Sequence, residues 1–157
     1  GFQTHLRFPE QKRVFSMIPA LRNAEFVRYG VMHRNTFLDS PRLLDATYAL
    51  KSDPRIRFAG QMTGVEGYVE STASGWVAGV AAAMEVLGRP MPQLDRFTAV
   101  GALASYISDH TVTKFQPMNI NFGIIEPLGY KIKGKREKNA KISERALERI
   151  ESLKGEL

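Results

Sequence analysis

The chain has 157 residues, a formal net charge of +6 and no cysteine, a length that suits one ordinary domain with a hydrophobic core. The lack of cysteine excludes disulfides, thiolate metal ligands and a cysteine nucleophile within this sequence, and it suits a reducing compartment such as the cytoplasm. Because no run of eighteen apolar residues occurs, the sequence predicts no membrane span. The chain starts at a glycine with no signal-peptide pattern, so we expect a segment of a longer protein.

Basic residues gather toward the two ends of the chain. Residues 1–42 carry a net charge of +4, residues 43–130 a net charge of −2, and residues 131–157 a net charge of +4. Basic ends around an apolar middle are typical of a packed centre whose flanks meet a polyanion. Ordinary solvated lysines and arginines give the same count, so charge alone leaves both interpretations open.

The first thirty residues predict two strands around a short helix. Apolar residues alternate with polar ones over Phe2–Phe8, which indicates a strand with one buried face. Pro9 predicts the start of a helix that runs to Met17. Residues Ala24–Tyr29 indicate the second strand.

A polar loop follows at Gly30–Phe37, where glycine, histidine, arginine, asparagine and threonine are crowded together. Binding residues often lie on such loops. His33, Arg34 and Asn35 are therefore candidate ligand contacts, although an ordinary surface loop explains the same residues equally well.

The central stretch predicts a hairpin that leads into a glycine-broken turn. Tyr48–Lys51 and Arg55–Ala59 indicate two strands across a polar turn, and the second strand continues into Phe58–Ser71. Three glycines in this turn let the backbone bend sharply and approach a flat ligand. The helix that follows offers unpaired N–H groups and a positive dipole end to a phosphate, a carboxylate or the edge of a reduced flavin. An ordinary strand-to-helix turn is the alternative.

Three helices and one irregular segment are predicted after this turn. The helices are Tyr68–Leu87, rich in small residues, a second from Thr98 as N-cap to Ile107, and an amphipathic closing helix in the basic tail. The segment Phe115–Gly123 has no helical period, and its Asn119 and Asn121 could either lie along a ligand or satisfy backbone groups.

Several motifs that would identify an enzyme are missing from the sequence. It contains no Gly-x-Gly-x-x-Gly fingerprint after a strand and no Gly-x-Ser-x-Gly elbow. His5, His33 and His110 lack the spacing of metal ligands, so we expect no metal site. The residues alone support an α/β protein with one ligand-binding turn.

Five segments together resemble the C-terminal part of the bacterial folate- and FAD-dependent tRNA (uracil-5-)-methyltransferases, flavoproteins related to the glucose-inhibited division protein A family. They come in family order and span nearly the whole chain. These segments are Glu10–Phe15, Arg28–Phe37, Gly60–Ser71, Gln116–Gly123 and Ile142–Leu147.

The resemblance implies an α/β fold made of the C-terminal portion of a Rossmann-like FAD-binding domain, the end of an inserted α/β domain and a C-terminal helix. On this basis we expect residues 1–50 to close the inserted domain. Residues 51–130 would return to the FAD-binding domain, and residues 131–157 would form a basic linker and the amphipathic helix.

The resemblance also assigns residues to the cofactor. It puts the glycine-broken turn beside the isoalloxazine ring and makes Tyr68 the residue that stacks on that ring. The backbone N–H groups of Val65 and Glu66 would stabilise negative charge on the reduced pyrimidine edge. The cofactor-binding residues that it implies are Gly60, Gln61, Thr63, Gly64, Val65 and Glu66.

The implied reaction moves a one-carbon unit from methylenetetrahydrofolate to C5 of the T-loop uridine of tRNA, with electrons from reduced FAD and recharging by NAD(P)H. A cysteine thiolate is the family's nucleophile, and this chain has none. We therefore expect no activity from the chain without the N-terminal part of the enzyme. Folate or RNA contacts are expected at His33, Arg34, Asn35, Asn119 and Asn121.

Two other functions stay open from the sequence. One is a paralogue that methylates a uridine of ribosomal RNA. The other is a non-catalytic RNA-binding segment built on the basic tail, whose candidate RNA contacts are Lys133, Lys135, Arg136 and Lys138.

Overall fold

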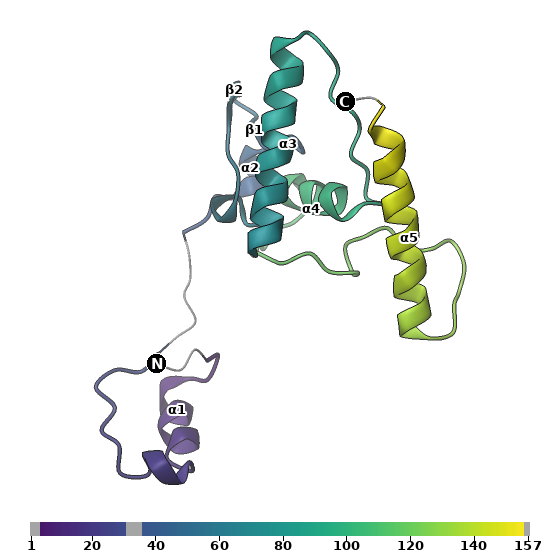
Figure 1. Cartoon of the computed structure of the whole chain (residues 1–157). Helices are drawn as coiled ribbons and strands as arrows, with labels where there is room; N and C mark the ends of the chain where they lie inside the picture. The colour runs from purple at the N-terminus through teal and green to yellow at the C-terminus, as the bar shows by residue number, and fades with distance from the viewer. Residues whose placement is uncertain (1–3, 31–35, 156–157) are drawn as a thin grey trace. The chain divides into compact units, whose positions relative to one another are not determined.

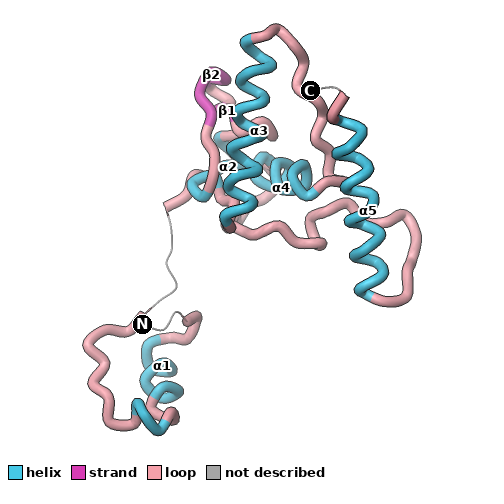
Figure 2. Tube along the Cα trace, in the orientation of Figure 1, coloured by secondary structure: helices cyan, strands magenta, loops and turns pink. Residues whose placement is uncertain are grey.

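The computed structural model describes residues 4–30 and 36–155 and divides the chain into two compact units, Gly1–Asn35 and Thr36–Leu157. The described residues form helices and one two-stranded sheet (Figures 1 and 2). This composition agrees with the expected mixed α/β class. None of the helices within the described ranges is long and apolar enough to cross a membrane.

The first unit is built around helix α1 (Phe8–Phe15), which is followed by the short 3-10 helix η1 (Pro19–Leu21). A proline in the first turn of α1 suits the helix because its fixed φ is already helical. The buried side chain of Gln11 donates hydrogen bonds from Nε2 to the carbonyl oxygens of Leu6 (2.7 Å) and Gly30 (2.6 Å). The predicted helix is thus confirmed. The side-chain amide of Gln11 links the residues before the helix to those at the end of the described part of this unit.

The two strands predicted in this unit are wrong for the residues that the structure describes. Thr4–Arg7 and Ala24–Tyr29 contain no strand. The N–H of Leu6 donates to Thr4 Oγ1, and Val27 is 98% exposed. A strand is stable when its backbone groups pair with a neighbouring strand. Here the hydrogen bonds of Gln11 and stacked aromatic rings stabilise the unit instead of strand pairing. The stacked rings are Phe8 with Tyr29, Tyr29 with Phe26, and Phe26 with Phe15.

The second unit begins with the short helix α2 (Ser40–Leu43) and the antiparallel strands β1 (Ala49–Leu50) and β2 (Asp53–Arg57). Leu50 faces Asp53 across a tight connection, so the predicted hairpin is confirmed. At the end of β2, Arg57 forms an ion pair of 2.5 Å with Glu85 of the long helix that follows.

That long helix, α3 (Tyr68–Val86), starts after Gly67 and ends before Gly88, whose φ of +64° stops it as predicted. Helix α4 (Ala99–Ser108) is capped by Thr98, whose Oγ1 accepts a hydrogen bond of 3.0 Å from the N–H of Gly101. Both predicted helices are confirmed.

Helix α4 contributes side chains to two hydrophobic clusters and lies between α2 and α5 (Figure 1). Leu103 and Ile107 pack into the larger cluster with Val77 of α3. On another side of α4, Ala102 packs with Ile125 and Ile142 in the smaller one.

The closing helix α5 (Lys135–Leu153) is also confirmed, with Ile142 and Leu153 buried. Two arginines attach it to the unit. Arg145 donates from both Nη atoms to the carbonyl oxygens of Glu126 and Pro127 and lies 4.6 Å from the centre of the Phe97 ring. Arg149 Nε forms an ion pair of 2.7 Å with Asp95 Oδ2.

Candidate functional site

The candidate site is the turn between β2 and α3, which contains the 3-10 helix η2 (Gln61–Thr63). Its glycines Gly60, Gly64 and Gly67 have φ values of +75°, +86° and +101°. Side chains are strained in this region of φ, so all three positions require glycine. A Cβ added at Gly64 would lie 2.3 Å from the ring of Phe115, which fills the space under the turn.

Three buried hydroxyl groups hold the turn in this conformation. Ser74 Oγ accepts a hydrogen bond of 2.7 Å from the N–H of Gly60. Thr63 Oγ1 donates to the carbonyl oxygen of Gly60 (2.7 Å), and Ser40 Oγ donates to that of Thr63 (2.8 Å). Since buried polar groups are costly unless paired, these bonds specify the backbone path.

A second segment, residues 116–121, lies about fifty residues further along the chain and packs against the turn. The turn and this segment together are called the wall below. Val65 and Met118 make a parallel bridge, in which Glu66 N–H donates to Met118 oxygen and Met118 N–H donates to Gly64 oxygen, both at 3.0 Å. The Glu70 carboxylate accepts a bond of 3.2 Å from the N–H of Ile120. The turn and residues 116–120 are therefore fixed relative to each other.

The two asparagines of this wall are used on backbone groups. Asn119 Nδ2 donates to the Glu66 carbonyl oxygen (3.0 Å). Asn121 Nδ2 donates to the Asn119 carbonyl oxygen (3.2 Å), and its Oδ1 accepts from the N–H of Gly123 (2.9 Å). These hydrogen bonds stabilise the irregular segment, and both side chains remain exposed.

The exposed part of the site lies at the start of α3. The Tyr68 side chain is 95% exposed, Val69 80% and Met62 45%, and Gln61 is also exposed. Thr63 and Val65 are fully buried. This surface presents an aromatic ring and apolar side chains beside a helix N-terminus.

Several N–H groups of the site are unpaired. Those of Val65, Tyr68, Val69 and Glu70 have no acceptor among the described residues. The N–H of Glu66, in contrast, is taken by Met118. The arrangement suits a planar aromatic ligand with an electron-rich edge, since the ring of Tyr68 can stack and the helix start attracts negative charge.

Four supporting residues were not singled out from the sequence: Ser40, Ser74, Glu70 and Phe115. Glu70 had the clearest signal, because an acidic residue at the third position of a helix often contacts backbone N–H groups. Ser40 and Ser74 carried none, as their partners lie 23 and 14 residues away.

Near the site, burial raises the pKa of Tyr48 well above its ordinary value, so this core hydroxyl stays protonated.

The remaining predicted residues do not join the turn. His33, Arg34 and Asn35 lie outside the described residues. Lys133, Lys135, Arg136 and Lys138 are exposed at and before the start of α5 and form no ion pair with any described residue. Within the same ranges, no group of three or more histidine or acidic side chains is placed to hold a metal ion.

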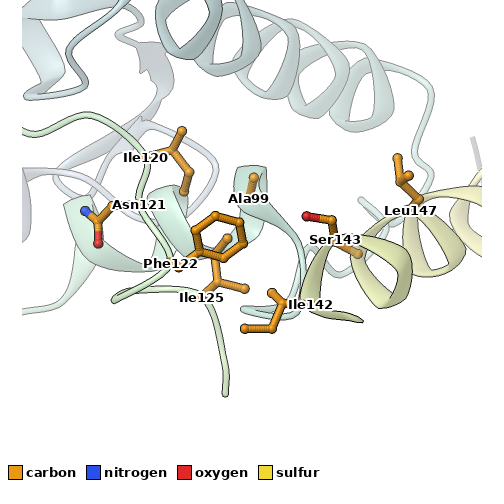
Figure 3. Close-up of a pocket in the computed structure, with 9 residues that line it drawn as sticks. Ala99, Ile120, Asn121, Phe122, Ile125, Ile142, Ser143 and Leu147 are labelled. Carbon is orange, nitrogen blue, oxygen red and sulfur yellow. The ribbon is translucent and has the colours of Figure 1, made fainter. Parts of the chain in front are cut away.

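A second feature is an apolar groove of about 370 Å³ between α5 and the segment 120–125. Figure 3 shows the ring of Phe122 between Ile120 and Asn121 on one side and Ser143 and Leu147 of α5 on the other. Ile125 and Ile142 are buried beneath the groove. The sequence predictions did not name the groove, although they named one of its lining residues, Asn121, as a folate or RNA contact.

Comparison with known proteins gives one family and close relatives. The sequence model of the family described as "Glucose inhibited division protein A" matches residues 1–90. The relatives include three proteins with the name "Methylenetetrahydrofolate--tRNA-(uracil-5-)-methyltransferase TrmFO". That of Acetivibrio thermocellus is 62% identical over 147 residues, which cover 94% of this chain and 34% of the relative.

The other two relatives are similar along the whole chain. The Desulfitobacterium hafniense protein is 56% identical over 154 residues, covering 98% of this chain and 35% of the relative. The Listeria monocytogenes protein is 55% identical over 157 residues, covering 100% of this chain and 36% of the relative. The chain therefore spans about a third of the length of the curated relatives it matches.

Proposed function

This chain belongs to the glucose inhibited division protein A family, and we propose that it is the C-terminal third of a cytoplasmic, FAD- and folate-dependent enzyme that methylates C5 of the T-loop uridine in tRNA. The names of relatives with 55–62% identity support the reaction and the RNA substrate. The structural observation that carries the proposal is the start of α3, where the exposed ring of Tyr68 lies beside unpaired N–H groups.

We propose that residues 1–50 close an inserted domain, that residues 51–130 complete a Rossmann-like FAD-binding domain, and that residues 131–157 form a linker and closing helix. The division of the chain into two compact units supports separate parts, and their boundary lies between Asn35 and Thr36, so that α2 and β1 pack with the second unit. The hairpin that feeds the glycine-broken turn and α3 supports the return to a nucleotide-binding domain.

The residues of the turn fit a flavin. In our proposal Tyr68 stacks on the ring system, and the backbone of Gly60, Gln61 and Gly64 follows its edge. The N–H groups of Tyr68, Val69 and Glu70 approach the pyrimidine edge, and Val65, which is fully buried, fixes the backbone before them through its bridge with Met118. Glu66 fixes the backbone of the turn, because its N–H donates to the Met118 carbonyl oxygen and its own carbonyl oxygen accepts from Asn119.

Bound FAD would supply the electrons that reduce the transferred one-carbon unit, with NAD(P)H as their source and methylenetetrahydrofolate as the carbon donor. The residues of this chain orient that cofactor and keep water from it, through Met62, Tyr68 and Val69. The Phe115 ring under Gly64 keeps the turn from shifting. The nucleophile that activates the uridine comes from the rest of the enzyme, because this chain has no cysteine.

A chimeric enzyme tests the proposal. This chain replaces the matching segment of the Acetivibrio thermocellus relative, which is 62% identical. We expect the chimera to retain FAD and to methylate uridine in tRNA with methylenetetrahydrofolate and NAD(P)H. Tyr68→Ala should weaken FAD binding about tenfold, the scale of one lost aromatic stacking contact.

Tyr130→Ala is the matched control, because Tyr130 is also exposed (62%) but lies away from the turn in sequence and makes no part of the wall. It should leave FAD binding unchanged. Methylation of ribosomal RNA in place of tRNA would favour the paralogue. Equal FAD affinity of the Tyr68→Ala and unaltered chimeras would remove Tyr68 from the cofactor site.

A further inference from the structure

We infer that the groove between α5 and the segment 120–125 receives an unpaired base of the substrate RNA, while the basic start of α5 holds the adjoining phosphates. The inference rests on the proposed tRNA methyltransferase function, and it adds a binding site at a distance in sequence from the flavin-facing turn. No residue of the groove belongs to the turn.

The groove has an exposed aromatic and aliphatic lining over a buried floor. Phe122 is 44% exposed and Leu147 71% exposed, whereas Ile142 is 1% and Ile125 8% exposed. Exposed apolar side chains that converge on a hollow are typical of a binding surface. The ring of Phe122 offers a stacking platform for a base, because every base has a π-face.

One polar group at the rim is unused. The hydroxyl of Ser143, which lies across the groove from Asn121 (Figure 3), makes no hydrogen bond with any described residue. A serine hydroxyl both donates and accepts, so it can meet the hydrogen-bonding edge of any base. The amide of Asn121, in contrast, is already bonded on both of its ends.

Cations extend the groove along α5. Lys138 and Lys135 lie four and seven residues before Ile142, so helical spacing puts all three on one face. Neither lysine forms an ion pair with a described residue, and Glu137 is the only acid between Lys131 and Lys141.

These cations are not explained by the stability of the helix. Positive charge at a helix N-terminus opposes the helix dipole and is unfavourable. Binding of phosphates would compensate this cost. Charge complementarity therefore favours RNA over a polypeptide segment as the occupant of the groove, because an apolar segment would leave the lysines unpaired.

Binding of a tRNA transcript to the chimeric enzyme, measured over a salt series, tests the inference. Phe122→Ala should weaken tRNA binding about tenfold, and Phe122→Leu, which keeps the bulk and removes the ring, should weaken it severalfold. Replacing Lys135 and Lys138 together by glutamine should reduce the slope of log affinity against log salt by about 1.5, since each lost phosphate contact removes about 0.7–0.9.

Lys154→Gln is the control for charge. Lys154 follows the other end of α5 and is paired with Glu151 at 2.6 Å, so its loss should leave tRNA affinity and the salt slope unchanged. Equal tRNA affinity of the Phe122→Ala, Phe122→Leu and unaltered enzymes would overturn the inference.

A thiol introduced by Leu147→Cys distinguishes RNA from a protein cover. Peptide mapping after alkylation should find position 147 labelled in the free enzyme and protected when tRNA is bound. Protection without RNA would mean that polypeptide fills the groove, and equal labelling with and without tRNA would mean that RNA does not reach it. Either result overturns the inference.

The two proposals fail separately. A chimera that binds tRNA through Phe122 but does not methylate it would contradict the proposed function and leave the inference standing. A chimera that methylates tRNA with an affinity independent of Phe122, Lys135 and Lys138 would do the reverse.

Discussion

Helices α3 and α5 are each 19 residues long, but they are attached to the second unit in different ways. Helix α3 has only two charged side chains, Glu70 and Glu85, and packs through small and apolar residues. Helix α5 is rich in charge and is attached through the buried side chains of Ile142 and Leu153 together with Arg145 and Arg149. Helix α3 is therefore positioned mainly by small and apolar side chains, and α5 also by long charged side chains.

This difference separates two kinds of site. The turn before α3 is fixed by hydrogen bonds between backbone groups and buried hydroxyls. Such a rigid backbone suits the binding of a cofactor in one fixed orientation. The start of α5 presents flexible lysines without partners among the described residues, which suits the irregular phosphate backbone of RNA. Substitutions should therefore affect the two helices by different mechanisms.

The largest effect is expected from Gly64→Ala in the turn. The new Cβ would meet Phe115 and would force alanine to a φ of +86°, so the free energy of unfolding should fall by about 2–4 kcal/mol. Urea unfolding followed by circular dichroism measures it. Gly79→Ala, in the middle of α3, is the control, because nothing lies within 4 Å of its added Cβ. It should stabilise the chain by about 0.5–1 kcal/mol.

If Gly64→Ala unfolded at the same urea concentration as the unaltered chain, the turn would not be held by its backbone. A loss of stability in Gly79→Ala would indicate that this face of α3 is covered by another part of the protein, where a methyl group has no room.

The elements that the sequence predicted correctly are those with local signals. The hairpin, α3, α4 with its Thr98 cap and α5 each depend on spacing and terminators within a few residues. The strands expected at Phe2–Phe8 and Ala24–Tyr29 are absent from the described residues Thr4–Phe8 and Ala24–Tyr29, because alternation does not say whether a partner strand exists. In the described part of the first unit, stacked aromatic rings and Gln11 take up the contacts that a sheet would make.

The site shows the same limit. The sharp turn could be predicted, because three glycines within eight positions indicate a backbone with positive φ values. The wall between Gly64 and Met118 could not, because the bridge joins residues more than fifty positions apart. Nor does sequence show whether the amide of Asn119 meets a ligand or a carbonyl group, since only the folded chain brings Glu66 within 3.0 Å of it.

Arg145→Ala tests the side-chain attachment of α5 and is expected to have the second largest effect. It removes two hydrogen bonds to carbonyl oxygens and the contact with Phe97, so stability should fall by about 2–3 kcal/mol. Hydrogen exchange should show the loss first in α5. Arg145→Lys should recover less than half of it, because an ammonium group cannot bond two carbonyl groups as the planar guanidinium does. Full recovery by lysine would mean that charge alone holds the helix.

The smallest effect is expected from the exposed ion pair on the same helix, Lys141 with Glu144, which are 2.7 Å apart. The hydrogen bond that Lys141 Nζ donates to Glu144 Oε2 raises the pKa of Lys141 above its ordinary 10.5. Any contribution to stability is therefore complete below pH 10.5 and is lost as the pH rises through the higher folded value. Glu144→Gln should return the pKa of Lys141 toward 10.5 in an NMR titration and leave stability at pH 7 nearly unchanged, because exposed pairs contribute little. A large loss at pH 7 would mean that surface charge holds α5 as firmly as Arg145, and the contrast between the free lysines and the anchoring arginines would disappear.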